Sequence, residues 1–274
     1  MFTLNCRGRL LCLEEPVVMG ILNVTPDSFY ADSRIEDEKS LVEQAGRMVQ
    51  DGAIILDIGG QSTRPGSKKI SAEEEVQRVI PAIQMIRKTF PDIFISVDTY
   101  YSEVARLAAA EGADMINDIS AGLLDPDMGH IVGAAGLPYI MMHMKGDPQN
   151  MQGHTDYHEL IPDILRYFTE RMEYMKQYGI KDIIIDPGFG FAKTIEQNFA
   201  ILSDLNQFHI LDKPVLVGIS RKSMVWKTLK TTPEHALNGT TVLNTIALIK
   251  GCHILRVHDV KEAVECIRLT RMIK

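Results

Sequence analysis

The sequence predicts the α/β class, in the form of one TIM (β/α)8 barrel preceded by a short N-terminal β-hairpin. Eight short apolar segments alternate with eight amphipathic segments along the 274 residues. Each apolar segment is typical of a parallel strand that is buried on both faces, and each ends in polar residues. Eight units of such even spacing favour the barrel over a doubly wound sheet, which is the structural alternative.

Composition predicts one globular domain over residues 1–274, with residues 1–15 as the hairpin. Hydrophobic residues make up 45% and charged residues 24%, which provides ample core. A net charge of −7 without a basic stripe argues against a nucleic-acid partner. Four cysteines without metal-binding spacing indicate free thiols in a reducing cytoplasm. No apolar run approaches membrane-spanning length, so we expect a cytoplasmic protein without a membrane partner.

The predicted strands are short and end at residues that cannot continue them. Residues 2–14 alternate loosely around Arg7-Gly8-Arg9, which predicts the hairpin. The first barrel strand stops before Pro26, because proline fixes φ and lacks a donor for the ladder. The eight predicted barrel strands are Val17–Val24, Ile54–Ile58, Ile93–Val97, Met115–Ile116, Pro138–Met142, Ile183–Ile185, Val215–Gly218 and Ile254–Val257.

The segments between strands carry apolar residues at helical spacing. The first helix follows a polar loop, Tyr30–Glu38, and the second is preceded by a capping box of Ser71 and Glu74. The helices that follow cover Glu103–Ala110, about Pro126–Ala135, Ile161–Tyr178, Ile195–Leu205, about Pro233–Ile249 and a closing segment that includes residues 263–267.

Polar side chains stand at the C-terminal end of every predicted strand, where the strands of a barrel converge on one mouth. Any one of them could be a helix cap or a structural residue, but eight polar ends together indicate a site. They are Asn23, Thr63, Arg64, Asp98, Asn117, His143, Asp186, Ser220, Lys222, Arg256 and His258.

These residues divide by charge into two halves. The first half suits a phosphate or pyrophosphate, because arginine gives bidentate contacts to such oxygens. It contains Asn23, Thr63, Arg64, Arg256 and His258. Asn23 with waters could hold Mg²⁺ against the anion, since Mg²⁺ accepts few protein ligands and shares substrate oxygens.

The second half suits a planar heterocycle with amino and ring N–H donors. Asp98, Asn117 and Asp186 supply acceptors, and Lys222 would face the acceptors of the ring. A structural ion pair of Lys222 with one aspartate is the alternative. Phe29, Phe189 and Phe191 add apolar surface for a flat ligand, or else anchor loops in the core.

At these residues the chain resembles the dihydropteroate synthase family of the folate pathway, from Val17 to Ile267. The eight matching segments occur in order, which makes the resemblance specific. They are Asn23-Val24-Thr25-Pro26-Asp27-Ser28-Phe29, Ser62-Thr63-Arg64-Pro65-Gly66, Val97-Asp98-Thr99, Ile116-Asn117-Asp118, Met142-His143-Met144, Asp186-Pro187-Gly188-Phe189-Gly190-Phe191, Ser220-Arg221-Lys222-Ser223 and Arg256-Val257-His258-Asp259.

The resemblance implies a homodimeric transferase that joins 6-hydroxymethyl-7,8-dihydropterin pyrophosphate to p-aminobenzoate and that sulfonamides inhibit. It implies that Asp98, Asn117, Met142, Asp186 and Lys222 bind the pterin, with Asp98, Asp186, Lys222 and Arg256 catalytic. It places pyrophosphate at Asn23, Thr63, Arg64, Arg256 and His258, with Mg²⁺ at Asn23. It places p-aminobenzoate at Phe29, Pro65, Phe191, Lys222 and Ser223, under lids formed by the first two loops.

One segment departs from the family pattern. The first loop of the family continues from phenylalanine into Ser-Asp-Gly-Gly, whereas this chain reads Tyr30-Ala31-Asp32-Ser33-Arg34. We therefore assign no role to Asp32.

The mechanism that fits these residues is dissociative, with loss of pyrophosphate before the aryl amine attacks, because no activated side-chain nucleophile stands out. Two other functions are compatible with a pterin site. One is a pterin-dependent methyltransferase of related fold, which would not need the pyrophosphate half. The other is a non-catalytic pterin-binding protein, which would have lost some of the site residues.

Overall fold

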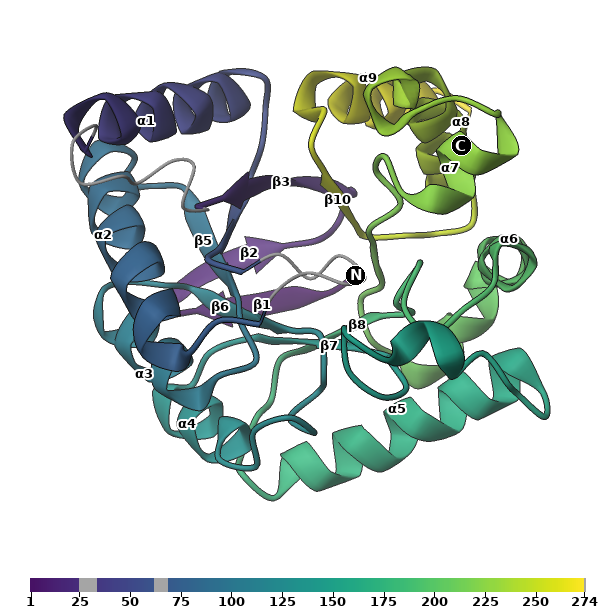
Figure 1. The fold of residues 1–274 in the computed structure, drawn as a ribbon, viewed down its shortest axis with the longest axis horizontal. Coiled ribbons are helices and arrows are strands. Elements are labelled where there is room, and N and C mark those ends of the chain that lie inside the picture. Colours follow the sequence, from purple (N-terminus) through teal and green to yellow (C-terminus); the bar gives the residue numbers. More distant parts are fainter. Residues whose placement is uncertain (25–33, 62–68, 274) are drawn as a thin grey trace.

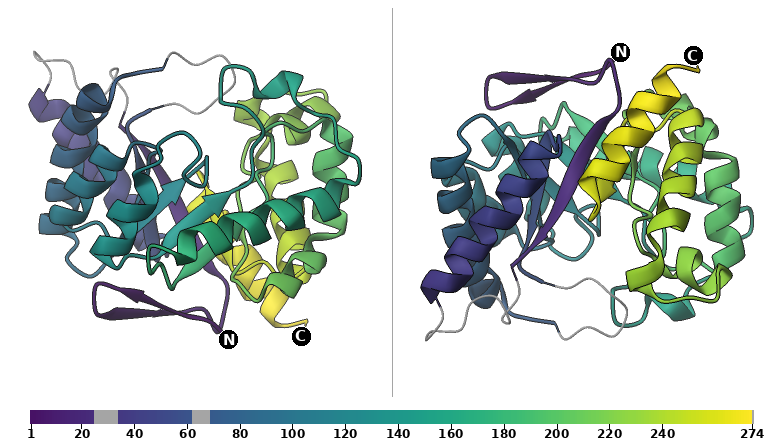
Figure 2. Two further views of the ribbon diagram at one scale, coloured as in Figure 1. Left: turned by 90° about the horizontal axis from the view of Figure 1, so that it is seen from below. Right: turned by 90° about the horizontal axis from the view of Figure 1, so that it is seen from above.

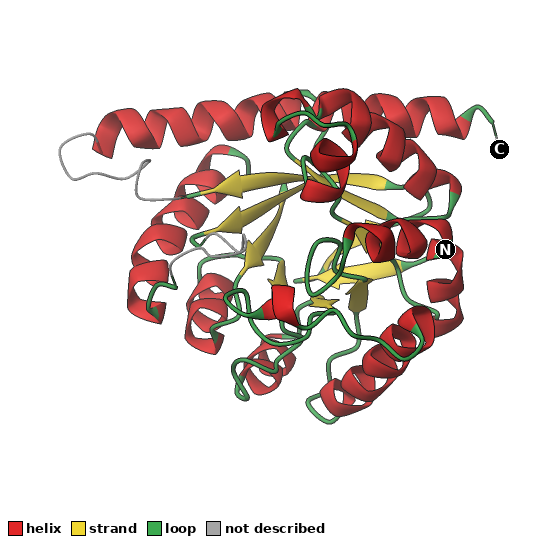
Figure 3. Cartoon of the chain, turned by 45° about the vertical axis from the view of Figure 1, so that its right-hand side comes forward, coloured by secondary structure: helices red, strands yellow, loops and turns green. Residues whose placement is uncertain are grey.

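A computed structural model describes residues 1–24, 34–61 and 69–273, and residues 34–37 by their backbone alone. Eight parallel strands follow one another in the order β8-β7-β6-β5-β4-β3-β10-β9. A bridge between Ile185 and Val215 joins the two ends of this sheet, so the strands enclose a barrel. Helices surround the strands on the outside (Figure 1, Figure 3). This arrangement confirms the predicted TIM barrel.

Each predicted strand is present, with boundaries that move by at most two residues. The barrel strands are β3 Val17–Asn23, β4 Ile55–Gly59, β5 Phe94–Asp98, β6 Met115–Asp118, β7 Tyr139–Met142, β8 Ile183–Asp186, β9 Leu216–Val217 and β10 Ile254–Val257. The α-helices are α1 Arg34–Gln50, α2 Ala72–Thr89, α3 Ser102–Ala110, α4 Met128–Ala135, α5 Leu160–Lys176, α6 Ile195–Ser203, α7 Ser223–Thr228, α8 Leu237–Ile249 and α9 Val260–Arg271. Short 3-10 helices cover Met151–Gly153, Leu205–Leu211 and Pro233–His235. None of the described helices is long and apolar enough to span a bilayer.

The ends of some helices differ from the prediction, mostly where a segment has too few apolar residues to show the helical spacing. The first helix already begins at Arg34, inside the predicted loop, because Ile35 is the only apolar residue before Leu41 and one such residue does not show the period. Ser71 caps α2 by accepting from the Glu74 amide at 3.2 Å, while the Glu74 carboxylate pairs with Arg78. A full capping box, missed in the sequence, starts α6 at Thr194. Pro233 begins a separate 3-10 turn, so the predicted seventh helix is reduced to α8.

The hairpin of β1 (Thr3–Cys6) and β2 (Arg9–Cys12) closes the N-terminal end of the barrel. Arg7 and Gly8 turn it with φ of 57° and 85°, the left-handed conformation that a tight two-residue turn requires. Leu4, Leu11 and Leu13 are buried against the lowest inward-facing layer of the strands. That layer consists of Met19, Ile55, Met115, Ile140, Ile184, Leu216 and Ile254. Figure 2 shows the hairpin lying across one end of the barrel.

The period of two along each strand brings polar residues inward above this apolar layer. On β4, β6, β8 and β10 the residue two positions after a member of that layer is polar: Asp57, Asn117, Asp186 and Arg256. The register also aligns these positions, because Asp98 pairs with Asn117, and Met142 pairs with Asp186. The interior therefore changes from apolar to polar towards the C-terminal mouth.

Candidate active site

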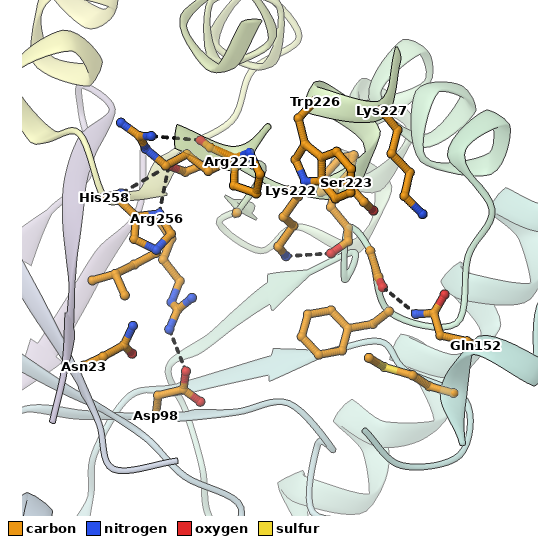
Figure 4. A pocket seen from close by; sticks show the side chains of 18 of the residues that line it. Asn23, Asp98, Gln152, Arg221, Lys222, Ser223, Trp226, Lys227, Arg256 and His258 are labelled. Carbon is orange, nitrogen blue, oxygen red and sulfur yellow. Dashed lines mark hydrogen bonds and ion pairs between the residues drawn. The ribbon is translucent and has the colours of Figure 1, made fainter. Parts of the chain in front are cut away.

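A cavity of about 510 Å³ opens at the C-terminal mouth of the barrel. The predicted residues that line it are Asn23, Asp98, Phe189, Phe191, Ser220, Lys222, Ser223, Arg256 and His258. Figure 4 labels six of them, Asn23, Asp98, Lys222, Ser223, Arg256 and His258. Asn117, Met142 and Asp186 lie among the strands below, where each is buried. Phe29, Thr63, Arg64 and Pro65 lie outside the described residues. The structure thus gathers most of the predicted set in one place.

Arg256 reaches from β10 past β3 to two carboxylates on the far side. Its Nε lies 2.6 Å from Asp57 Oδ2, and one terminal nitrogen lies 2.6 Å from Asp98 Oδ2. Figure 4 shows the guanidinium extended towards Asp98. The sequence interpretation assigned Arg256 to the anion half alone, but its length lets it join both halves.

Asp57 is a site residue that the sequence interpretation missed. It is fully buried, and its Oδ2 also accepts a hydrogen bond from Asn117 Nδ2 at 3.0 Å. One carboxylate oxygen thus orients both Arg256 and Asn117. The available signal was a charged residue in the middle of an otherwise apolar strand, since charges are rarely buried without a partner.

Burial shifts the protonation of the two predicted carboxylates. It raises the pKa of Asp98 to about 7, with Arg256 opposing the shift and Asp57 adding to it. Burial likewise raises the pKa of Asp186, opposed chiefly by Lys222. Asp186 Oδ1 accepts from the Gly188 amide at 2.8 Å, which fixes the carboxylate plane. A ligand that places hydrogen-bond donors between these two groups would favour their ionised forms.

Lys222 contacts the loop after β8. Its Nζ donates to the Phe189 carbonyl at 2.6 Å and lies 4.8 Å from the centre of the Phe191 ring. Burial lowers its pKa to about 8, while Asp186 and Asp98 oppose the shift. Among the described residues, Lys222 thus bonds a carbonyl oxygen and not a carboxylate. These contacts do not favour the alternative of a structural ion pair with an aspartate.

The segment that carries Lys222 and Ser223 is fixed by Arg221, whose φ of 55° is unusual for a residue with a side chain. Arg221 binds Asp259 through two contacts of 2.9 and 2.8 Å and also donates to two backbone carbonyls. Beside it, Ser220 Oγ lies 3.1 Å from Nδ1 of His258 and orients that imidazole at the cavity. Arg221 and Asp259 stood in the matching segments without an assigned role.

The described part of the cavity offers few ligands for a divalent cation. Among the residues that the structure describes, no three His, Cys, Asp or Glu side chains converge as a metal site. Asn23 is exposed at the mouth, and a Cβ added at Gly59 would lie 3.6 Å from Asn23 Oδ1 and 3.8 Å from Asp98 Oδ2. Glycine thus leaves the space between these oxygens open. One amide oxygen beside phosphate oxygens fits Mg²⁺, which keeps most of its own waters.

Comparison with known proteins identifies the relatives of this chain. A family profile described as "Pterin binding enzyme" matches residues 19–258. Dihydropteroate synthase of Escherichia coli K12 is 44% identical over 268 residues, which cover 97% of this chain and 94% of that protein. Dihydropteroate synthase of Synechocystis is 44% identical over 255 residues, 92% of this chain and 88% of that protein.

Solved structures agree with the sequence relatives. Yersinia pestis dihydropteroate synthase, solved with a sulfonamide drug, superposes with a TM-score of 0.93 at 40% identity over 99% of both chains. Xanthomonas albilineans dihydropteroate synthase, in complex with 7,8-dihydropteroate, gives a TM-score of 0.88 at 34% identity over 99% and 98% of the two chains. The chain therefore belongs to the pterin-binding enzyme family, within the dihydropteroate synthases.

Proposed function

We propose that this protein condenses 6-hydroxymethyl-7,8-dihydropterin pyrophosphate with p-aminobenzoate, giving 7,8-dihydropteroate and pyrophosphate. One observation carries the proposal. One cavity is lined by the buried carboxylate of Asp98 together with Arg256 and His258, and the carboxylate of Asp186 is buried below it. This arrangement suits a substrate with a planar, donor-rich ring at one end and an anion at the other.

In the proposed complex the pterin ring lies at the bottom of the cavity. Asp186 and Asn117 present an acceptor and an amide below the cavity, and Met142 packs in one buried cluster with Phe191 of the loop. Lys222 exchanges its bond to the Phe189 carbonyl for an acceptor of the ring. These polar groups are buried. Any of them that the bound ligand leaves without a hydrogen-bond partner therefore weakens binding.

The pyrophosphate lies at the rim, against Arg256 and His258, with Thr63 and Arg64 predicted to join from outside the described residues. Asn23 would hold Mg²⁺ there, and the ion would neutralise charge on the leaving group. Arg256 is already fixed by Asp57 and stays charged at working pH. It therefore stabilises the departing oxygens without further reorganisation.

The proposed reaction breaks the CH₂–O bond first, and the bonding electron pair leaves with pyrophosphate. The cation that remains on the pterin is stabilised by the Asp98 and Asp186 carboxylates. The aryl amine then forms the new C–N bond and releases a proton to solvent. Phe191 and Ser223 line the cavity where the amine would enter, and Phe29 and Pro65 are predicted to complete that pocket.

Assembly, location and inhibition are part of the proposal. Exposed apolar side chains on α8 and α9, among them Val242, Ile249 and Leu269, support a homodimer. Four free cysteines, three of them buried, support a reducing cytoplasm. Since the Yersinia pestis relative was solved with a sulfonamide drug, we expect sulfonamides to occupy the p-aminobenzoate pocket here.

The test is product formation by the purified protein. Incubation with the pterin pyrophosphate, p-aminobenzoate and Mg²⁺ should yield dihydropteroate and pyrophosphate in equal amounts, as measured by chromatography and phosphate assay. A parallel sample without p-aminobenzoate should release pyrophosphate if the first step is dissociative. A protein that binds the pterin tightly but makes no product would instead be a non-catalytic binder.

A further inference from the structure

The loop after β8, residues 187–192, has an unusual set of bonds. Each of five consecutive carbonyls accepts a hydrogen bond from a side chain. Lys193 Nζ bonds Gly188 O at 3.0 Å and Phe191 O at 2.9 Å, and Lys222 bonds Phe189 O at 2.6 Å. Gln152 bonds Gly190 O at 3.2 Å, and the Tyr157 hydroxyl bonds Ala192 O at 2.9 Å. The loop is thus held from both sides rather than by a sheet ladder.

This loop needs such support because one of its residues, Ala192, has an unfavourable backbone conformation. Gly188, Gly190 and Ala192 have φ of 74°, 82° and 51°, all in the left-handed region. Ala192 carries a Cβ, which makes that conformation unfavourable by itself. External donors that bond the neighbouring carbonyls offset this cost and select one loop conformation.

Lys193 is the central donor and is not used by the proposed chemistry. It is 4% exposed, and its Nζ also lies 3.0 Å from Nδ1 of His143 and 3.3 Å from the His143 carbonyl. His143 follows β7, so Lys193 ties the loop to the neighbouring strand end. The approach is close, since a Cβ at Gly188 would stand 2.1 Å from the His143 carbonyl oxygen.

The loop supplies one wall of the cavity. Phe189, Gly190 and Phe191 all line it, and Phe191 lies against Met142 and Met151 in a buried cluster. In the proposed reaction Lys222 leaves the Phe189 carbonyl to bind the pterin. At that moment the loop depends on Lys193, Gln152 and Tyr157 to keep its conformation.

We infer that Lys193 is a positioning residue that fixes the Phe191 wall of the second-substrate pocket, and thereby sets affinity for the aryl amine. The inference rests on the proposed function, because the occupant of that wall is the p-aminobenzoate of the proposed reaction. Two residues of the pterin side are held from outside this loop, since Arg256 bonds Asp98 and Asp57 bonds Asn117. Asp186 meets the loop at the Gly188 amide, which donates to its Oδ1 at 2.8 Å, but its backbone is held by the sheet, where its carbonyl accepts from the His143 amide at 3.0 Å.

The test is Lys193→Met, which keeps the length of the side chain and removes its donors. Lys181→Met is the matched control, because Lys181 is exposed and lies before the same strand. We expect the KM for p-aminobenzoate to rise at least tenfold in Lys193→Met, while the KM for the pterin pyrophosphate changes less than threefold. Calorimetry should show the same separation, with weaker sulfonamide binding and unchanged binding of 6-hydroxymethylpterin. The control should match wild type.

If Lys193 had only a general structural role, its loss would change the KM values of both substrates to a similar extent. Equal rises in both KM values, or no change in either, would overturn the inference. If Lys193→Met does not fold, Tyr157→Phe decides, because it removes only the hydroxyl that bonds Ala192 O. It should raise the KM for p-aminobenzoate about threefold and leave the pterin KM unchanged, and an unchanged p-aminobenzoate KM would also overturn the inference. Failure of wild type to form any product would instead refute the proposed function.

Discussion

Asp186 illustrates how one buried carboxylate can select a ligand. Its Oδ1 already accepts from the Gly188 amide, and burial keeps water from competing for the rest of the group. A ligand with paired donors therefore finds an acceptor that is oriented but not fully satisfied. The same geometry predicts what an amide at this position would do.

Asp186→Asn should weaken pterin binding, because the amide presents a donor where an acceptor is required. An unpaired buried donor costs about 1–3 kcal/mol, which corresponds to roughly 5- to 150-fold in affinity. Calorimetric titration with 6-hydroxymethylpterin measures this loss. The exposed Asp51→Asn variant is the control for the chemical change. Unchanged affinity would remove Asp186 from the pterin pocket.

Arg256 and Asp57 form a pair whose parts depend on each other. Arg256→Ala should lose about 3–5 kcal/mol of folding free energy, because it leaves the fully buried Asp57 without its cation. The variant should also lose affinity for pyrophosphate. Adding Asp57→Asn should restore part of the stability by removing the uncompensated charge, while pyrophosphate affinity stays low.

The measurement is urea unfolding of the two single variants and the double variant, with pyrophosphate titrations beside it. The double-mutant cycle gives the coupling between the side chains. Additive losses of stability would show that the 2.6 Å contact between them contributes nothing to folding.

Helix α2 contains a further buried acid, Glu75, which links the packing of the helix to pH. Burial raises the pKa of Glu75 to about 8, and the hydroxyl of Thr99 donates to it at 3.0 Å and opposes the shift. The folded protein therefore keeps a proton that the unfolded chain has already lost above about pH 4.5. Folding stability contributed by this group must fall as the pH rises from about 4.5 to about 8.

Glu75→Gln should remove this pH dependence, because the amide resembles the protonated acid. Within the window the slope of one such group approaches about 1.4 kcal/mol per pH unit. Urea unfolding at several pH values between 5 and 8 should show a flatter profile for the variant than for wild type. The exposed Glu43→Gln variant should keep the wild-type slope. Parallel profiles for Glu75→Gln and wild type would contradict the assignment.

At the scale of the whole molecule, the two predicted lids, Tyr30–Glu38 and Gln61–Ile70, connect the two ligand halves. Most of their residues lie outside the described ranges, so their role stays a prediction. Thr63 and Arg64 would bind pyrophosphate, and the same closure would bring Phe29 and Pro65 towards Phe191.

Pyrophosphate with Mg²⁺ should therefore strengthen sulfonamide binding, and the sulfonamide should strengthen pyrophosphate binding by the same factor, as linkage requires. Calorimetric titration of a sulfonamide, with and without saturating pyrophosphate and Mg²⁺, measures the factor, and the reverse titration checks it. We expect a gain of at least tenfold. Equal affinities would indicate a pocket that exists before the anion binds.

The sequence alone determined the architecture and most of the site. Eight apolar segments with polar ends predicted the barrel, because parallel strands buried on both faces have a distinct composition and because their C-terminal ends must meet. The same reasoning brought Asp98, Lys222, Arg256 and His258 together, and all four line one cavity in the structure. The hairpin was also readable, since Arg7-Gly8 marks a tight turn.

Only the tertiary structure decided which side chains touch. Arg256 crosses the barrel to Asp57 and Asp98, partners 199 and 158 residues away, and no local pattern encodes that choice. Lys193 reads as an ordinary loop lysine in the sequence, yet folding buries it among carbonyls from two strand ends. Strand periodicity specifies which residues point inward, whereas the length of a side chain and the shape of the closed barrel specify what each one reaches.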